Sequence, residues 1–299
     1  MYKECRLCPR QCHVNREKKK GDCHTGAQIL VARAALHMWE EPCISGENGC
    51  GAVFFSGCSL GCVFCQNRAI SGGQTGKAVS VERLVQIFFE LKEAGAHNIN
   101  LVTPDHYIPD VRKAVLQAKK LGIGIPFIYN CSGYVRAESL RLLESVVDVY
   151  LPDFKYWESE TAIKYSKAPD YPMYAREAIE EMVRQVGACS FFENGMIEKG
   201  VIVRHLLLPG KVREAKKIVQ YLYETYGDTI YVSLMNQYTP GADAGERFSD
   251  FPQLQRKVTK REYDRLIQYA LQLGVTNAFV QEGQTASESF IPSFDLEGV

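Results

Sequence analysis

The segment that most constrains this chain is the short run from Cys58 to Cys65, which holds three cysteines in the spacing C-x3-C-x2-C. It directly follows the apolar residues Ala52 to Phe55, so we expect a loop at the end of a buried strand. Cysteine thiolates are the usual ligands of iron–sulfur clusters, and a cubane cluster takes four of them. Because Cys58, Cys62 and Cys65 supply only three, one iron would keep an open position, as in catalytic metal sites. The sequence therefore predicts a reactive iron–sulfur centre on this loop.

The alternatives for these three cysteines are a zinc knuckle and a set of unrelated core residues. A zinc knuckle needs a second pair of cysteines or histidines nearby. No such pair follows Cys65 closely, and the next histidine is His97. The aromatic Phe64 before the last cysteine, together with the position at a strand end, also favours a cluster loop.

From residue 52 onward, short apolar runs alternate with longer amphipathic stretches. This alternation predicts βα units around a parallel sheet. Expected strands cover residues 52–56, 99–102, 126–129, 147–151, 201–207, 230–234 and 278–280, and expected helices cover 81–94, 109–120, 137–145, 174–187, 211–225 and 259–272. Ser80 is expected to cap the first of these helices, and Gly95 to end it. In a barrel or a doubly wound sheet alike, the chemistry belongs at the carboxyl ends of the strands.

The cysteine loop resembles that of the radical S-adenosylmethionine (radical SAM) enzymes. In that superfamily the amino and carboxylate groups of S-adenosylmethionine chelate the fourth iron, and an electron from the cluster cleaves the sulfonium to give a 5′-deoxyadenosyl radical. The resemblance implies an α/β fold with a partial (β/α)6 TIM-like barrel over residues 46–285, the doubly wound sheet being the structural alternative. It also implies a [4Fe-4S] cluster on Cys58, Cys62 and Cys65, bound S-adenosylmethionine, and an electron donor of the flavodoxin or ferredoxin type.

Longer segments resemble one radical SAM family, the pyruvate formate-lyase activating enzyme-like iron–sulfur proteins. The matching segments are residues 40–46, 65–67, 95–104, 204–210 and 234–240. This resemblance implies an oxidoreductase that abstracts hydrogen from a substrate, with a glycyl-radical enzyme as the first hypothesis. The alternatives are the modification of a peptide or small metabolite and a non-enzymatic iron–sulfur sensor or electron carrier. An open coordination position argues against a carrier, because carriers usually close the coordination sphere.

The same resemblance assigns cofactor-binding roles by position. Phe64 matches the aromatic residue that contacts adenine, and Gln66 lies in the matching segment beside it. Thr103 follows the second strand, where activating enzymes carry a Gly-Gly-Glu segment for the methionyl amino group that this sequence lacks. Asn130 and Ser132 end the third strand, where related enzymes hold the ribose and carboxylate with short polar side chains.

Charged residues lie on the next two strands. Asp153 and Lys155 stand two residues apart on an extended segment and therefore point to the same side. They either pair with each other or reach the charged ends of the substrate. Arg204 and His205 lie on opposite faces of their strand, so only one can line a barrel. Because activating enzymes place an arginine there, and a guanidinium suits a carboxylate, we expect Arg204 in the lumen and His205 in the packing.

The N-terminal region holds a second group of cysteines, with the spacing C-x2-C-x3-C-x10-C: Cys5, Cys8, Cys12 and Cys23. Four cysteines in a polar segment too short to fold by burial predict a second metal centre. Zinc and an iron–sulfur cluster both accept four thiolates, and the spacing does not choose between them. We therefore expect residues 1–45 to form a metal-binding extension and linker, and residues 286–299 to form a C-terminal tail.

Composition excludes several classes of partner. Lys plus Arg and Asp plus Glu both number 35, so nothing predicts nucleic acid or an anionic membrane as a bulk partner. The basic run that includes Arg16 and Lys18 is expected to be a solvated loop. The N-terminus lacks the apolar stretch of a signal peptide, and no apolar run approaches the roughly 18 residues that cross a bilayer. We expect a cytoplasmic protein whose cysteines bind metal rather than form disulfides.

Overall fold

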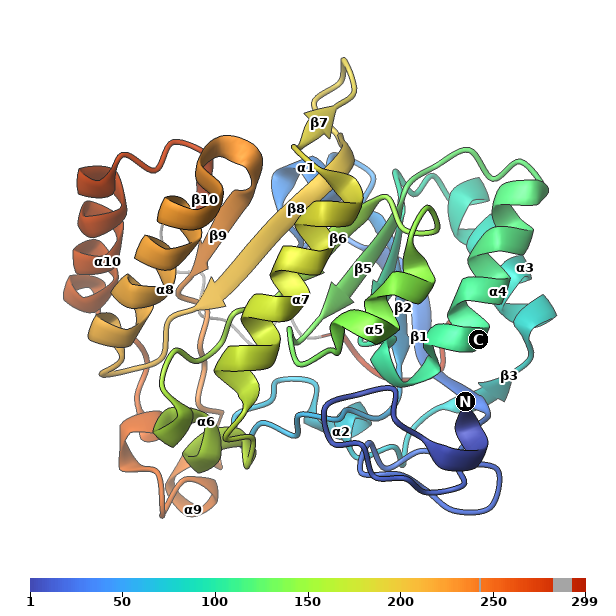
Figure 1. Ribbon diagram of the computed structural model, residues 1–299, viewed down its shortest axis with the longest axis horizontal. Helices are drawn as coiled ribbons and strands as arrows, with labels where there is room; N and C mark the ends of the chain where they lie inside the picture. Colours follow the sequence, from blue (N-terminus) through green and yellow to red (C-terminus); the bar gives the residue numbers. More distant parts are fainter. Residues whose placement is uncertain (242, 282–291) are drawn as a thin grey trace.

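The structure is a computed structural model that describes residues 1–241, 243–281 and 292–299. Its centre is one sheet with the strand order β10-β9-β8-β6-β5-β4-β2-β1-β3, and β7 (Ser190–Phe191) pairs with β8 (Figure 1). The strands that run parallel are β2 (Cys50–Phe55), β4 (Ile99–Val102), β5 (Phe127–Cys131), β6 (Val149–Pro152), β8 (Ile197–Leu206), β9 (Tyr231–Met235) and β10 (Ala278–Val280). The predicted α/β fold with a largely parallel sheet is confirmed.

The longer helices lie between successive strands, as expected. They are α3 (Val81–Glu93), α4 (Ile108–Lys120), α7 (Tyr171–Val186), α8 (Val212–Tyr226) and α10 (Lys260–Leu273). The shorter ones are α1 (Pro42–Ser45), α2 (Arg68–Ser71), α5 (Ala137–Leu140), α6 (Ser159–Ser166) and α9 (Ala244–Arg247). Ser80 caps α3, since its side chain accepts a hydrogen bond from the Arg83 amide at 3.2 Å. Within the described part of the chain, no helix is long and apolar enough to cross a membrane.

Alternate residues of each strand belong to two different cores. On β2, Val53 and Phe55 pack in the outer core beneath the helices, while Ala52 and Phe54 belong to an inner core enclosed by the curved sheet. This is the period of two expected of an extended strand. The inner face is therefore the one that carries side chains toward a lumen.

The sequence pattern does not predict β1 (Ile29–His37), which lies in the region assigned to the extension and linker. This strand pairs antiparallel with β2, and β3 (Lys77–Val79) pairs with part of its other edge. Its pairing partners follow it at long range, so no local turn signal marks it. The chain joins the sheet at Ile29, and the part outside the sheet is shorter than the expected 1–45.

The described end of the chain lies along β1. The Ala34 amide donates to the Glu297 carbonyl at 2.8 Å, and the Leu296 amide donates to the Ala32 carbonyl at 3.2 Å. Arg33 on the same strand forms an ion pair with Asp295 at 2.8 Å. The expected start of the tail at residue 286 lies outside the described residues.

Residues 1–28 form loops with one 3-10 helical turn at Tyr2–Glu4, and they lie against one end of the barrel, beside α2 (Figure 1). The hydroxyl of Tyr2 donates to Asp110 on α4 at 2.8 Å. The hydroxyl of Ser139 on α5 donates to the Leu7 carbonyl at 2.7 Å. The extension is thus attached to two helices of the barrel.

Arg16 corrects the expectation of a solvated basic loop, because this residue is only 2% exposed. Its guanidinium lies over the rings of Tyr2 and Tyr107, at 5.0 and 5.5 Å from their centroids. It donates to the carbonyl oxygens of His106 and Gly26. These partners come from distant parts of the chain, which is why the local run of basic residues gives no sign of burial.

Candidate active site

The cysteine loop begins where β2 ends and is shaped by left-handed glycines. Gly57 has φ of +93° and Gly61 has φ of +65°, a region that residues with a side chain rarely adopt. The Cys65 amide donates to the Cys62 carbonyl at 3.0 Å, which closes the turn between these two residues. The Leu60 amide points at Cys58 Sγ, 3.4 Å away. The backbone from Cys58 to Cys65 is therefore a tight, closed turn.

Neighbouring elements hold this loop in place. The Val63 amide donates to the Tyr165 carbonyl at 2.9 Å, and Arg247 donates to the Val63 carbonyl at 2.6 Å. Phe64 is buried and meets the rings of Tyr156, Tyr165 and Tyr238 edge to face, with centroids 6.1–6.3 Å apart. Edge-to-face pairs of this kind add to the stability that burial provides.

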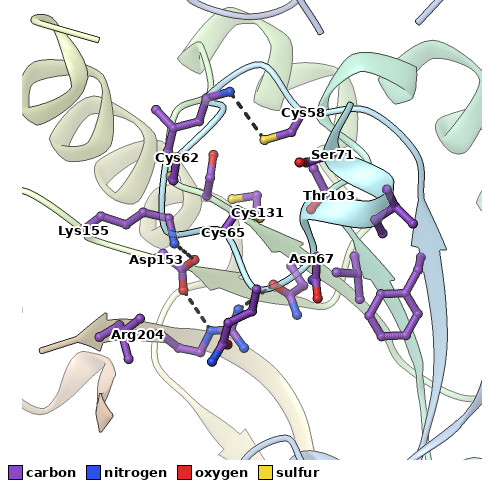
Figure 2. A pocket seen from close by; sticks show the side chains of 18 of the residues that line it. Cys58, Cys62, Cys65, Asn67, Ser71, Thr103, Cys131, Asp153, Lys155 and Arg204 are labelled. Atoms are coloured by element: carbon purple, nitrogen blue, oxygen red, sulfur yellow. Dashed lines mark hydrogen bonds and ion pairs between the residues drawn. The ribbon is translucent and has the colours of Figure 1, made fainter. Parts of the chain in front are cut away.

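The loop opens into a cavity of about 210 Å³ at the carboxyl ends of the strands. The predicted barrel site residues all line it: Cys58, Cys62, Phe64, Cys65, Gln66, Thr103, Asn130, Ser132, Asp153, Lys155 and Arg204. Figure 2 shows the three cysteines beside Cys131 and a row formed by Lys155, Asp153 and Arg204. The structure thus brings residues from five segments of the sequence to one place.

Asp153 lies between two cations. Its carboxylate accepts from Lys155 Nζ at 2.5 Å and from Arg204 Nε at 3.1 Å (Figure 2). Burial alone would raise the pKa of Asp153, but Lys155 and Arg204 hold it below its usual value. Burial would lower the pKa of Lys155, but Asp153 holds it above its usual value. Both groups are therefore charged at neutral pH, and the ion pair expected as one alternative is present.

Arg204 faces the lumen and His205 faces away, as the alternation along a strand requires. Besides Asp153, Arg204 donates to Asn130 Oδ1 at 2.8 Å and to Glu40 Oε2 at 2.9 Å. The His205 ring is buried on the other side, with Nδ1 2.7 Å from the Phe154 carbonyl. The side chain on the inner face is thus the one that reaches the cavity.

Glu40 is a charged lumen residue that sequence reasoning missed. It lies between β1 and α1, and its Oε1 accepts from Asn100 at 2.8 Å and from Asn130 at 3.2 Å. With Arg204 on its other oxygen, the carboxylate links β4, β5 and β8. The sequence offers one signal for Glu40, which is its place in the segment 40–46 that resembles the activating enzyme-like family. The residues around it, however, favour a linker.

Three other predicted site residues, Thr103, Ser132 and Gln66, are held in place by hydrogen bonds. Thr103 has φ of +59°, and its amide donates to the Asn130 carbonyl at 2.8 Å. A left-handed residue with a branched side chain is strained, and such strain persists where surrounding structure fixes it. The Ser132 carbonyl accepts from the Tyr171 hydroxyl at 2.9 Å, and Gln66 donates to the Gln237 carbonyl at 3.3 Å. The polar rim of the cavity is therefore fixed rather than loose.

Without a bound metal, the thiols of Cys58 and Cys65 are protonated at neutral pH. Burial first, and then the neighbouring thiols, raise the pKa of Cys58 to about 12 and that of Cys65 to about 11. Positive metal ions reverse this effect, since a coordinated thiol is deprotonated. In the described part of the chain, no three side chains of His, Cys, Asp or Glu are arranged to hold a single metal ion.

The N-terminal cysteines form a second, enclosed group. Cys5, Cys8 and Cys23 are each no more than 6% exposed, and Cys12 is half-buried. A Cβ added to Gly21 would lie 3.2 Å from Cys12 Sγ and 3.5 Å from Cys23 Sγ, so the missing side chain leaves room beside two sulfurs. The four N-terminal cysteines are thus largely shielded from solvent.

The two cysteine groups meet through the backbone. The Cys58 amide donates to the Cys23 carbonyl at 3.2 Å. A Cβ on Gly57 would lie 2.6 Å from that carbonyl, so a glycine is required for this approach. The first cysteine of the loop and the last cysteine of the extension are thus joined by one hydrogen bond.

Comparison with known proteins gives the family. Residues 52–222, over half of the chain, match the model of the Radical SAM superfamily. An uncharacterized protein of Methanocaldococcus jannaschii is 28% identical over 280 residues, which cover 90% of this chain and 75% of that protein.

Solved structures share the fold at low identity. SuiB of Streptococcus suis, bound to its precursor peptide SuiA, matches with a TM-score of 0.51 and 13% identity, covering 76% of this chain and 47% of SuiB. A radical SAM methyltransferase of Sphaerobacter thermophilus matches with a TM-score of 0.50 and 17% identity, covering 80% of this chain and 69% of that one. A domain of pyruvate-formate lyase-activating enzyme from Bacteroides vulgatus matches with a TM-score of only 0.36 and 14% identity, covering 60% of this chain and 91% of that domain. The three-cysteine loop, the barrel and the family match agree: the chain belongs to the radical SAM superfamily.

Proposed function

We propose that this protein cleaves S-adenosylmethionine reductively and uses the product to abstract hydrogen from a substrate in the barrel cavity. The observation that carries the proposal is the three-thiol loop opening into a cavity lined by every predicted barrel site residue. When bound on Cys58, Cys62 and Cys65, a [4Fe-4S] cluster with S-adenosylmethionine supplies the 5′-deoxyadenosyl radical. The protein supplies the positions of the reacting groups and the exclusion of water.

The lumen residues divide the binding of S-adenosylmethionine among them. Phe64 and Gln66 stand at the loop, where they would contact the adenine side, and Asn130 and Ser132 supply polar groups for the ribose and carboxylate. The backbone at Thr103 would take the methionyl amino group in place of the absent Gly-Gly-Glu segment.

The charged residues Lys155, Asp153 and Arg204 have a different role from that of the polar residues. Arg204 has five N–H donors, and three bonds already go to Asp153, Asn130 and Glu40. Arg204 therefore positions these acceptors first and has further donors to offer a carboxylate. Lys155 and Asp153 are held charged by one another, and they would meet the charged parts of the cofactor or substrate.

For the substrate we favour a glycine in a peptide segment of a partner protein, as in a glycyl-radical activase. SuiB, which shares this fold, is bound to its precursor peptide. A small metabolite is the second candidate. We further propose a flavodoxin- or ferredoxin-type electron donor, and a metal centre on Cys5, Cys8, Cys12 and Cys23.

The test of cofactor cleavage uses anaerobically reconstituted protein with a strong chemical reductant. We expect wild-type protein to form 5′-deoxyadenosine and methionine, and Cys58→Ala, Cys62→Ala and Cys65→Ala to form none. Cys189→Ser is the matched control, since this thiol is half-buried and lies against the Val201 carbonyl, away from the cavity. Full turnover by a loop variant would contradict the proposal.

The test of the substrate class follows deuterium. Partner peptides labelled at the glycine α-carbon should transfer deuterium into 5′-deoxyadenosine and leave a glycyl radical visible by electron paramagnetic resonance. Deuterium transfer from a labelled small metabolite alone would assign the second candidate instead.

A further inference from the structure

We infer that the outer edge of β1 at Leu36 binds an extended peptide segment of a partner protein, which adds to the sheet as a further strand beside the active cavity. The inference rests on the proposed function only in taking this segment to carry the substrate glycine. Three observations support it: the direction of the β1 backbone, the exposed apolar side chains of this strand, and a hollow that adjoins the cavity.

The outer edge of β1 is covered over its first part only. β3 pairs with residues 29–31, and the C-terminal residues follow, ending with the hydrogen bond from the Ala34 amide to the Glu297 carbonyl. The strand itself continues to His37. Beyond Ala34, no residue in the described part of the chain pairs with this edge. A short stretch of sheet edge is therefore open.

The backbone of Leu36 faces this open edge. The residue opposite Leu36 on β2 is Gly51, whose amide donates instead to the Asn98 carbonyl at 2.9 Å. Residue pairs in an antiparallel ladder alternate between hydrogen-bonded and non-hydrogen-bonded, so Leu36 and Gly51 form a non-hydrogen-bonded pair. The N–H and C=O of Leu36 consequently point away from β2. An extended peptide recognises an open strand edge through such groups.

Large apolar side chains accompany the open edge. Leu36, Met38 and Trp39 are 37%, 43% and 56% exposed. Natural sheet edges are usually protected from pairing by charged residues or proline. Residues 35–39 contain no lysine, arginine, aspartate, glutamate or proline. The edge therefore lacks the usual protection and presents apolar surface to a partner.

A hollow of about 160 Å³ lies along this part of β1. It shares four lining residues with the active cavity, namely His37, Trp39, Phe54 and Pro292. Arg33 is the one charged side chain among the described residues that line the hollow, and it is already paired with Asp295 and Glu297. The hollow therefore suits an apolar side chain, and a segment bound there adjoins the cavity.

An extended peptide fits this edge better than a second copy of the chain. If two β1 edges paired about a two-fold axis at Leu36, Ala34 of each copy would lie opposite Met38 of the other. The C-terminal residues already bonded to Ala34 occupy the place that the second strand would need. A single peptide strand beginning beyond Ala34 meets no such obstacle.

The first test measures peptide binding through tryptophan fluorescence. The tryptophans of this chain are Trp39 and Trp157, so Trp157→Phe leaves Trp39 beside the hollow as the reporter. The probe is a short synthetic peptide in which valine and threonine alternate around one central glycine, a composition that favours strands. We expect a saturable change in Trp39 emission without reductant or S-adenosylmethionine. No change would overturn the inference.

The second test asks whether the peptide binds through its backbone. Alternate amides of an added strand face the edge, so two versions of the peptide are N-methylated, one at each set of alternate amides. One version should bind roughly ten- to a hundredfold more weakly, because it loses about two hydrogen bonds, and the other should bind as the parent peptide does. Equal affinities of the two versions would overturn strand addition. The protein is unaltered here, so a folding defect cannot cause the result.

The third test changes the edge itself. Leu36→Pro removes the outward N–H and breaks no bond to β2, and proline is tolerated on a sheet edge whose N–H faces solvent. We expect this variant to bind the parent peptide about tenfold more weakly, and Leu36→Ala, which keeps the N–H, to lose less. Equal affinity of Leu36→Pro and the unchanged edge would overturn the inference.

Two controls separate the alternatives. Sedimentation of the wild-type chain without peptide should show no dimer that Leu36→Pro dissociates, and such a dimer would assign the edge to a second copy and overturn the inference. Cys58→Ala should bind the peptide as the wild type does. Because binding is measured without cofactor cleavage, failure of cleavage with binding intact would contradict the proposed function alone, and loss of binding with cleavage intact would contradict this inference alone.

Discussion

The two cysteine groups of this protein are neighbours but differ in access. The loop group has three thiols, lines a cavity and stands at the ends of parallel strands. The N-terminal group has four cysteines, mostly buried, in loops that lie outside the sheet. The difference teaches that cysteine number and exposure change together: the group of three lines an open cavity, and the group of four is mostly enclosed.

Each region also contains a largely enclosed arginine, and the two are stabilised differently. Arg204 in the barrel is paired with the carboxylates of Asp153 and Glu40. Arg16 in the extension donates to neutral oxygens, those of Thr25, Gly26 and His106, and lies beside a thiol. Removing either cation should therefore cost a different amount of stability.

The largest effect is expected for Arg204→Ala. It leaves the largely buried Glu40 carboxylate without its cation and Asp153 with Lys155 alone, and breaking a buried ion pair in this way costs about 3–5 kcal/mol in the free energy of unfolding. Denaturant unfolding measures this loss, and Arg204→Lys, which keeps the charge, should lose less. A change within about 0.5 kcal/mol, as for surface substitutions, would contradict the structural role of Arg204.

A smaller effect is expected for Arg16→Ala. The substitution leaves buried carbonyl oxygens without a donor, which costs about 1–3 kcal/mol. The loss should be local, so limited proteolysis should cut the N-terminal loops before the barrel. Equal proteolysis of both regions would show that the extension and barrel unfold together and would remove the distinction drawn between them.

The smallest effect on stability is expected for Asp105 and His106, which lie where the N-terminal extension meets the barrel. Burial raises the pKa of Asp105 to about 7, although Tyr129 donates to it at 2.7 Å. The folded protein thus keeps a proton that the unfolded chain loses near pH 4, so this residue's contribution to stability falls as pH rises from about 4 to 7. Burial lowers the pKa of His106 to about 3, and its contribution therefore rises with pH over about 3 to 6.5.

These opposite slopes partly cancel in the wild type, and Asp105→Asn removes only the first. The variant should therefore gain stability relative to the wild type as pH rises from about 4 to 7. Denaturant unfolding of both proteins at several pH values provides the measurement. Parallel curves would mean that Asp105 does not hold its proton in the folded state.

The sequence predicted the barrel strands well, because buried parallel strands are short apolar runs bounded by polar helices. The barrel site residues that it predicted all line the cavity, since the carboxyl ends of such strands meet at one edge. It did not predict β1, because the apolar residues of β1 are recognised as a strand only from their pairing with β2 and β3.

Long-range contacts also explain why the sequence did not predict the positions of two individual residues. Arg16 belongs to a basic run, and its burial depends on Tyr107 and His106, which lie far along the chain. Glu40 enters the lumen from outside the βα pattern, so its partners Asn100 and Arg204 could not be inferred from spacing. In each case a long-range contact overrides what the local sequence favours.

The pairing of charges in the cavity has a consequence for ionic strength. Among the described residues that line it, Glu40 and Asp153 balance Lys155 and Arg204, and burial lowers the pKa of His37 to about 4, so that this ring is neutral at pH 7. Apart from its cysteines, the lining has no net charge to attract a ligand from a distance. Added salt screens charges over about 10 Å at 0.1 M and acts little on buried pairs. The affinity for S-adenosylmethionine should therefore vary little between dilute buffer and physiological salt.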